Sequence, residues 1–176
     1  LAPPDTLAAA IADSTTLALP PPEPPFFPAA SPGMEIARLI GRQNFREARR
    51  QLDSLEKGPR PLREQQGLDF QRAYCAQALG DHPAALAALR RLQHACPDLE
   101  DYRLFWLSRS LEETSDPQGA TAQYEALLAA GQHPALLGET RLRLAELCLK
   151  QGQRPRALEL YGQLLEAPQA PTALAR

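Results

Sequence analysis

The sequence has little of what marks a metal protein or a redox protein. Its 176 residues include three cysteines and three histidines. The cysteines, Cys75, Cys96 and Cys148, form no C-x-x-C pair and no Cys/His motif with zinc-binding spacing. Cys75 and Cys148 lie among apolar residues at helical spacing, where a thiol packs as a small hydrophobe. The sequence therefore predicts no metal site and no cofactor.

The sequence also lacks the short motifs that carry catalytic chemistry. It contains no His-x-x-x-His, no His-Glu-x-x-His, no Gly-x-Ser-x-Gly and no glycine-rich phosphate loop. His82 and His133 each precede a proline, which favours a position at a helix junction. The acidic pair Glu112-Glu113 falls at a predicted helix end, where solvated carboxylates are more common than an acid/base pair with separated pKa values. We expect no enzyme activity from this chain, and any catalytic domain would lie outside it.

No excess of charge and no long apolar run points to nucleic acid or to a membrane. Lys and Arg number 19 and Asp and Glu number 21, for a net charge of -2. A nucleic-acid surface needs a basic excess, and a spanning helix needs about 18 consecutive apolar residues. The chain starts without Met and without the basic and apolar segments of a signal peptide. We expect no nucleic-acid partner, no integral membrane segment, and either a processed chain or an excised fragment.

Proline, in contrast, is abundant at the N-terminus. Residues 1–33 contain the run from Leu19 to Pro28, which cannot be helical because each proline removes a backbone donor and restricts the residue before it. This segment predicts an extended, semi-rigid arm. Phe26 and Phe27 in the arm either attach it to the first helices or serve as a recognition motif for a partner domain.

From residue 34 the spacing of apolar residues becomes helical and the pattern repeats. Each copy has a turn, a small alanine, and apolar residues four and seven positions later. The four alanines, 37, 35 and 37 residues apart, are Ala48, Ala85, Ala120 and Ala157. Two antiparallel helices that cross at an alanine explain the pattern, because a larger side chain would separate them. Gly80 and Gly152 precede two of the alanines and predict the end of a first helix.

These residues resemble the tetratricopeptide repeat (TPR) family, whose unit is a helix-turn-helix of about 34 residues. The fourth copy, with Ala145, Gly152, Ala157 and Tyr161, is similar to the family pattern, and the second follows it with Ala73, Gly80 and Ala85. The third copy departs from it, with Ser115 in place of the turn glycine. The resemblance implies an all-α fold, a right-handed α-solenoid of about four TPR-like repeats over residues 34–167. Residues 168–176 would be the start of a further helix or a C-terminal tail.

The resemblance also implies a binding groove, because the first helices of TPR units line the concave face of the solenoid. The inward positions of the family pattern carry aromatic and charged residues here, the classes that dominate binding energy at interfaces. The predicted partner-binding residues are Phe70, Tyr74, Gln77, Tyr102, Phe105, Arg109, Glu112 and Glu146. We expect a scaffold that binds a protein or peptide partner.

An alternative function rests on a second, short resemblance. The segment from Glu100 to Leu107 resembles the helical superstructure of soluble lytic transglycosylases, in which a similar helix opens a repeat. It implies the non-catalytic helical part of a bacterial peptidoglycan-cleaving enzyme, whose catalytic domain would follow Arg176. The repeats and the arm favour a periplasmic or cell-envelope location, with the cytoplasm as the alternative.

Overall fold

The computed structural model describes residues 31–55, 58–92, 99–131 and 133–166. Within these residues the chain forms eight helices and no strand. The helices, numbered from α2, are α2 (Pro32–Gly41), α3 (Phe45–Ser54), α4 (Leu62–Ala78), α5 (His82–Arg91), α6 (Glu100–Glu113), α7 (Pro117–Ala130), α8 (Pro134–Lys150) and α9 (Arg154–Glu166). The first helix begins at Pro32 after the capping residue Ser31, inside the last residues of the predicted arm. Residues 1–30, with Phe26 and Phe27, and residues 168–176 lie outside the described part of the chain.

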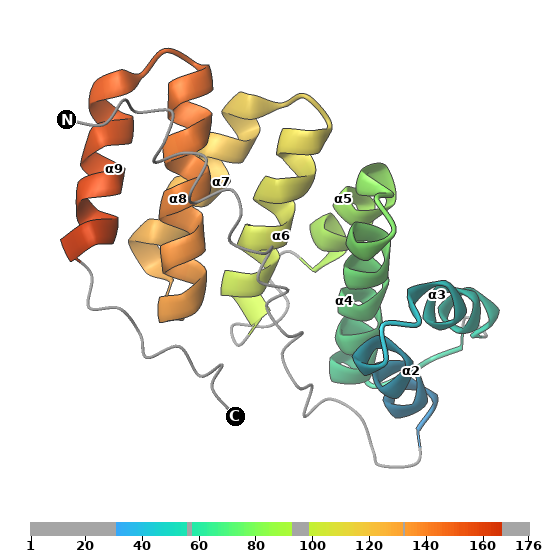
Figure 1. Cartoon of the computed structure of the whole chain (residues 1–176). Helices are drawn as coiled ribbons and strands as arrows, with labels where there is room; N and C mark the ends of the chain where they lie inside the picture. Colours follow the sequence, from blue (N-terminus) through green and yellow to red (C-terminus); the bar gives the residue numbers. More distant parts are fainter. Residues whose placement is uncertain (1–30, 56–57, 93–98, 132, 167–176) are drawn as a thin grey trace.

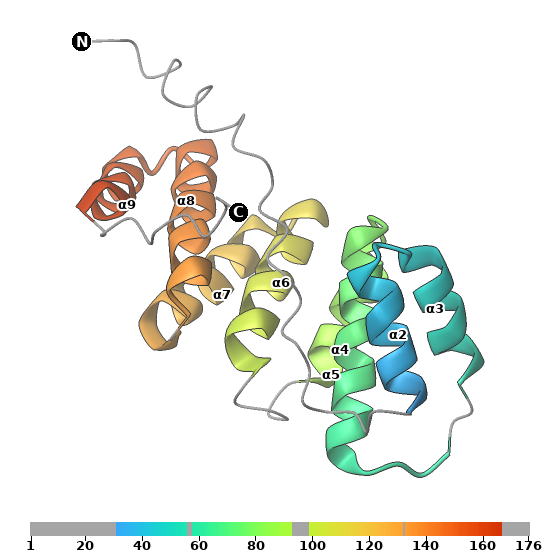
Figure 2. The same ribbon diagram turned by 60° about the horizontal axis from the view of Figure 1, so that its bottom comes forward.

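The helices form four antiparallel pairs that stack in chain order. Each second helix packs against its own first helix, and α3, α5 and α7 also pack against the first helix of the next pair. The first helices α2, α4, α6 and α8 also contact one another in sequence, whereas the second helices of the described residues do not. Figure 1 shows α4, α6 and α8 side by side, with α2 and α3 at one end and α9 at the other (Figure 2 turns this view). The predicted all-helical solenoid of about four pairs is confirmed.

The repeated alanine lies at the crossing of each pair. Ala48, Ala85, Ala120 and Ala157 all have an exposed fraction of 0%. Four positions later in the second helix, Leu52, Leu89 and Tyr124 are equally buried, as the spacing predicts. The corresponding residue of the last pair, Tyr161, is only half-buried. The alanine register therefore marks the buried side of each second helix, as expected of a helix crossing.

The four turns between paired helices share one backbone conformation. Five residues before each alanine the chain enters the left-handed region, at Gln43 (φ 58°), Gly80 (φ 73°), Ser115 (φ 62°) and Gly152 (φ 77°). In every turn the next residue donates its N–H to a carbonyl five residues earlier, over 2.8 to 2.9 Å. These bonds satisfy carbonyls at the end of the first helix. Gly80 and Gly152 end their helices as predicted, and two turns adopt the same conformation without glycine.

Three of the second helices begin with the same side-chain cap. Asn44, Asp81 and Asp116 each accept a hydrogen bond from the backbone N–H three residues later, over 2.9 to 3.4 Å. A cap of this kind satisfies an N–H that has no partner within the helix. The left-handed residue and the cap that follows it together reverse the chain within a few residues, which brings the two helices together at the alanine.

The turn conformation predicts opposite effects for two exchanges. Because a left-handed backbone costs a residue with a side chain about 1 kcal/mol more than glycine, Ser115→Gly is expected to raise the free energy of unfolding by about that amount. Gly152→Ser is expected to lower it by a similar amount. Urea unfolding followed by circular dichroism measures both. Two shifts of the same sign would contradict this account of the turns.

The alanine crossing predicts a difference between two neighbouring exchanges on α7. Ala120→Leu inserts three carbons where the helices touch, and overpacking of this kind costs about 1–3 kcal/mol. Ala122→Leu, at an exposed position of the same helix, is the matched control and is expected to leave stability within about 0.5 kcal/mol. Thermal unfolding of both variants tests this, and equal melting temperatures would show that the crossing tolerates a larger side chain.

Candidate partner-binding face

Three of the eight predicted groove residues belong to the core. Phe70, Tyr74 and Phe105 are 5%, 9% and 1% exposed. Phe105 packs against the ring of Tyr124 on α7, with the ring centroids 6.5 Å apart. The physical reason is that α4 and α6 are each covered by the first helices beside them and by second helices on two sides. These three aromatic residues therefore fill the interior of the solenoid, and a partner would reach at most their edges.

Tyr102 of α6 lies at the margin of this core. Its ring meets Phe70 of α4 edge-on, with centroids 6.4 Å apart. On its other side it lies 5.1 Å from the imidazole of His133, the residue that precedes α8. Tyr102 is half-buried, whereas Phe70 is buried. Of the predicted aromatic residues, Tyr102 is the one that the structure leaves partly accessible.

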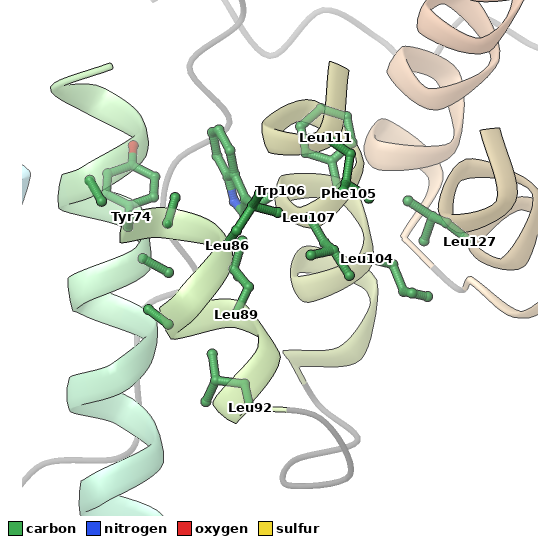
Figure 3. Close-up of a cluster of buried hydrophobic side chains, with 14 of the residues drawn as sticks. Tyr74, Leu86, Leu89, Leu92, Leu104, Phe105, Trp106, Leu107, Leu111 and Leu127 are labelled. Carbon is green, nitrogen blue, oxygen red and sulfur yellow. The ribbon is translucent and has the colours of Figure 1, made fainter. Parts of the chain in front are cut away.

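Trp106, which was not among the predicted groove residues, links α4 to α6. Its ring meets Tyr74 edge-on, with centroids 5.4 Å apart. Figure 3 shows Trp106 extending toward Tyr74, while Phe105 leaves α6 on the other side. The Trp106 indole N–H is buried and has no acceptor among the described residues. The family pattern points to position 105, so Trp106 was missed; its spacing of three residues from Arg109 was the available signal.

Arg109 lies directly over the Trp106 ring. Its guanidinium carbon is 5.4 Å from the centre of the indole, a cation–π contact. The side chain is half-buried, and it forms no ion pair with a carboxylate among the described residues. The indole therefore holds the guanidinium in place, and its hydrogen-bond donors remain available for a partner.

Gln77, in contrast, is occupied within the chain. Its side-chain amide donates to the carbonyl of Trp106 over 2.7 Å and to the hydroxyl of Ser110. Both acceptors belong to α6, so Gln77 fastens α4 to the next first helix. Its role in the structure is to join two repeats.

Glu112 is also used for packing. Its carboxylate accepts a 2.5 Å hydrogen bond from the hydroxyl of Tyr124, which is completely buried in α7. Burial raises the pKa of Glu112, while the Tyr124 hydroxyl and the charges of Arg143, Lys150 and Arg109 oppose the rise. Burial likewise raises the pKa of Tyr124 well above its usual value, and the negative charge of Glu112 adds to it. This hydrogen bond joins α6 to α7.

Charged residues of α8 complete the surface beside Glu112. Arg143 donates to Glu139 over 3.0 Å. Glu146 is half-buried, and Lys150 at the end of α8 is exposed. We call the accessible surface over these two helices the α6–α8 face, and its residues are Tyr102, Arg109, Glu112, Arg143, Glu146 and Lys150. It combines one aromatic edge, three cations and two carboxylates.

The described residues hold no group of three or more metal-ligating side chains. Cys75 and Cys148 are free and buried, as predicted, and burial raises the pKa of Cys75 to about 12. Cys96 lies outside the described residues. His82 begins α5 and His133 precedes α8, so both occupy the predicted helix junctions. No helix in the described ranges is long and apolar enough to cross a membrane.

The raised pKa of Glu112 predicts a pH dependence of stability. The folded state holds the proton of the Glu112 carboxyl more tightly than the unfolded chain does. The stabilisation that this proton gives is therefore present below the ordinary pKa of 4.5, and it is lost as the pH rises through the pKa of Glu112 in the folded state. Glu112→Gln keeps an acceptor for Tyr124 and cannot ionise. Its free energy of unfolding is therefore expected to fall less than that of the wild type between pH 4 and pH 7.

The matched control is Glu113→Gln, at the exposed neighbouring position. It is expected to keep the wild-type pH profile in the same urea titrations. A Glu112→Gln profile that parallels the wild type at every pH would show that the protonation of Glu112 contributes nothing to stability.

Comparison with known families gives one match. The family model described as tetratricopeptide repeat matches residues 68–98, which include most of α4 and all of α5. No curated protein and no solved structure matches the chain. The matched segment contains Ala73, Gly80 and Ala85, the residues on which the resemblance of the second copy rests.

Proposed function

Because residues 68–98 are a tetratricopeptide repeat, a unit that suggests protein–protein interaction, we propose that the chain is a non-catalytic scaffold that binds a segment of a partner protein along its α6–α8 face. The neighbouring helix pairs share the buried alanine and the left-handed turn of the matched unit. The first helices contact one another and so form a continuous row on which an extended or helical segment can lie.

The position of Arg109 is the observation that carries this proposal. A guanidinium fixed on an aromatic ring loses little freedom when it binds, and it donates to a carboxylate in a fork of two hydrogen bonds. Tyr102 lies on the same helix, seven residues earlier, and offers the edge of an aromatic ring. Tyr and Arg are enriched among the residues that dominate interface energies. A partner segment with a carboxylate opposite Arg109 and an apolar side chain against Tyr102 fits this face.

The charges of the face restrict the partner further. Arg143 is already paired with Glu139, and Glu112 is bonded to Tyr124. Of the three cations of the face, Arg109 and Lys150 form no ion pair within 4 Å among the described residues, and Glu146 lies one helical turn before Lys150 on α8. A segment with two acidic residues and a nearby basic one would complement them. No comparable observation supports the peptidoglycan-related alternative or the periplasmic location, and both stay predictions.

The proposal is tested with a display library of random peptides selected on the full chain. Trp106 is the only tryptophan, so its fluorescence reports directly on binding beside Arg109. Selected peptides are expected to be acidic and to change the Trp106 emission. Arg109→Ala is expected to weaken their binding by roughly tenfold to 100-fold, since hydrogen bonds to a charged group contribute about 1.5–3 kcal/mol.

Arg90→Ala is the matched control, because Arg90 is exposed on the second helix α5, away from the row of first helices. It is expected to leave the affinity unchanged. Peptides that bind Arg109→Ala as tightly as the wild type, without a change in Trp106 emission, would place the binding surface elsewhere and overturn the proposal.

A further inference from the structure

The segment that precedes α2 carries the two kinds of side chain that the proposed partner needs, a carboxylate and an apolar group. Residues 1–30, which lie outside the described part of the chain, contain no lysine and no arginine, and their carboxylates are Asp5, Asp13 and Glu23. Glu23 lies in the proline run, three residues before Phe26. Arg109 and Lys150 of the α6–α8 face form no ion pair among the described residues. The segment and the face are therefore complementary in charge.

The spacing within this segment matches the spacing on α6. In the extended conformation that the prolines predict, three residues make one turn and each adds about 3.1 Å, so Glu23 and Phe26 lie on one side of the segment about 9 Å apart. Tyr102 and Arg109 are seven residues apart, which puts them on one side of α6 about 10 Å apart. Contact of Phe26 with Tyr102 therefore brings the Glu23 carboxylate to the level of Arg109.

The start of α2 lies at the same height as Tyr102. The buried side-chain amide of Gln71 on α4 donates to the carbonyl of Gly33 on α2 over 2.9 Å. Phe70, the residue before Gln71, meets the ring of Tyr102 on α6. One turn of α4 therefore contacts the first turn of α2 and also Tyr102, and Figure 2 shows α2 and α6 on two sides of α4. The chain enters α2 level with the aromatic edge of the α6–α8 face.

The segment is long enough to cross α4. Packed helices lie about 8–10 Å apart, so α2 and α6, on two sides of α4, are separated by about 20 Å. Phe26 is seven residues before Gly33, and an extended chain of that length covers about 22 Å. Phe26 can therefore reach Tyr102 without any change in the arrangement of the helices.

We propose that the segment from Pro20 to Pro28 occupies the α6–α8 face of its own chain, with Glu23 on Arg109 and Phe26 against Tyr102. This inference rests on the proposed function of the face, and it adds that the chain itself regulates access to that face. Attachment to α2 gives the segment an effective concentration on the order of 1 mM at the face. A partner therefore has to bind more tightly than the segment does in order to displace it.

Zero-length cross-linking of the full chain at low concentration tests the placement. A carbodiimide joins a carboxylate to an amine that contacts it. Arg109→Lys keeps the positive charge and supplies the amine, so the expected product is an amide with Glu23 within one chain, identified by mass spectrometry of the digested protein. Arg46→Lys, at an exposed position of α3, is the matched control and is expected to give no amide with Glu23.

Three results of the cross-linking would overturn the proposal. The first is linkage of the Arg109→Lys variant only to carboxylates other than Glu23. The second is equal linkage to Glu23 in both variants, which would show contact without a preferred site. The third is a Glu23 linkage found only between two chains, which would give the face to a second copy.

The effect on access is measured with the peptides selected for binding to the face. The double exchange Glu23→Gln and Phe26→Ala is expected to strengthen their binding by roughly tenfold, if the segment covers about nine-tenths of the faces in the wild type. Asp5→Asn is the matched control, because it removes a carboxylate from the same segment and keeps Glu23 and Phe26. It is expected to leave the affinity unchanged.

The outcomes separate this inference from the proposed function. If acidic peptides bind through Arg109 with equal affinity to the wild type and to the double exchange, the face binds partners and the proposal that the segment covers it is wrong. If Glu23 is cross-linked at position 109 but no selected peptide depends on Arg109, the segment occupies the face and the proposed binding of a partner there is wrong.

Discussion

The close approach of two helices at a buried alanine is the constraint on which the rest of the structure depends. A methyl group at the crossing lets the backbones come near enough for the side chains four and seven positions later to pack against the first helix. The same geometry recurs at Ala48, Ala85, Ala120 and Ala157, each with no exposed surface. The residue five positions earlier has a left-handed backbone conformation in all four pairs.

This constraint also decides which residues of a first helix can meet a partner. Helices α4, α6 and α8 are each packed by two second helices and lie beside another first helix, so only part of each stays exposed. On α6 this part includes Tyr102 and Arg109, while Phe105 and Trp106 face into the two neighbouring interfaces. The proposed binding surface is therefore coupled to the core, because the buried Trp106 ring holds the guanidinium that the proposed partner contacts.

A solenoid has ends, and the two ends of the described residues differ. The exposed surface of α2 carries the ion pair of Glu35 and Arg38, whereas α9 exposes Leu158 and Leu165.

The sequence by itself determined the fold class, the number of helix pairs and the register of the crossings. Local and periodic signals carry this information, since a turn, an alanine and apolar residues at fixed spacing specify helix-turn-helix units without reference to distant parts of the chain. It also predicted Tyr102 and Arg109 of α6 as partner-binding residues, and both are half-buried, which leaves them within the proposed surface. The left-handed turns at Gln43 and Ser115 were harder to predict from the sequence, because neither position holds the glycine that usually marks this backbone conformation. There the structural context imposes the conformation.

Only the tertiary structure decided which predicted groove residues are accessible. Phe70, Tyr74 and Phe105 share the inward positions of the family pattern but are buried, because helices from neighbouring pairs close over them. Gln77 and Glu112 are polar and look available in the sequence, yet their hydrogen bonds to Trp106, Ser110 and Tyr124 join separate helices. Contacts of this kind depend on how the repeats stack, and the spacing of residues within one repeat does not contain that information.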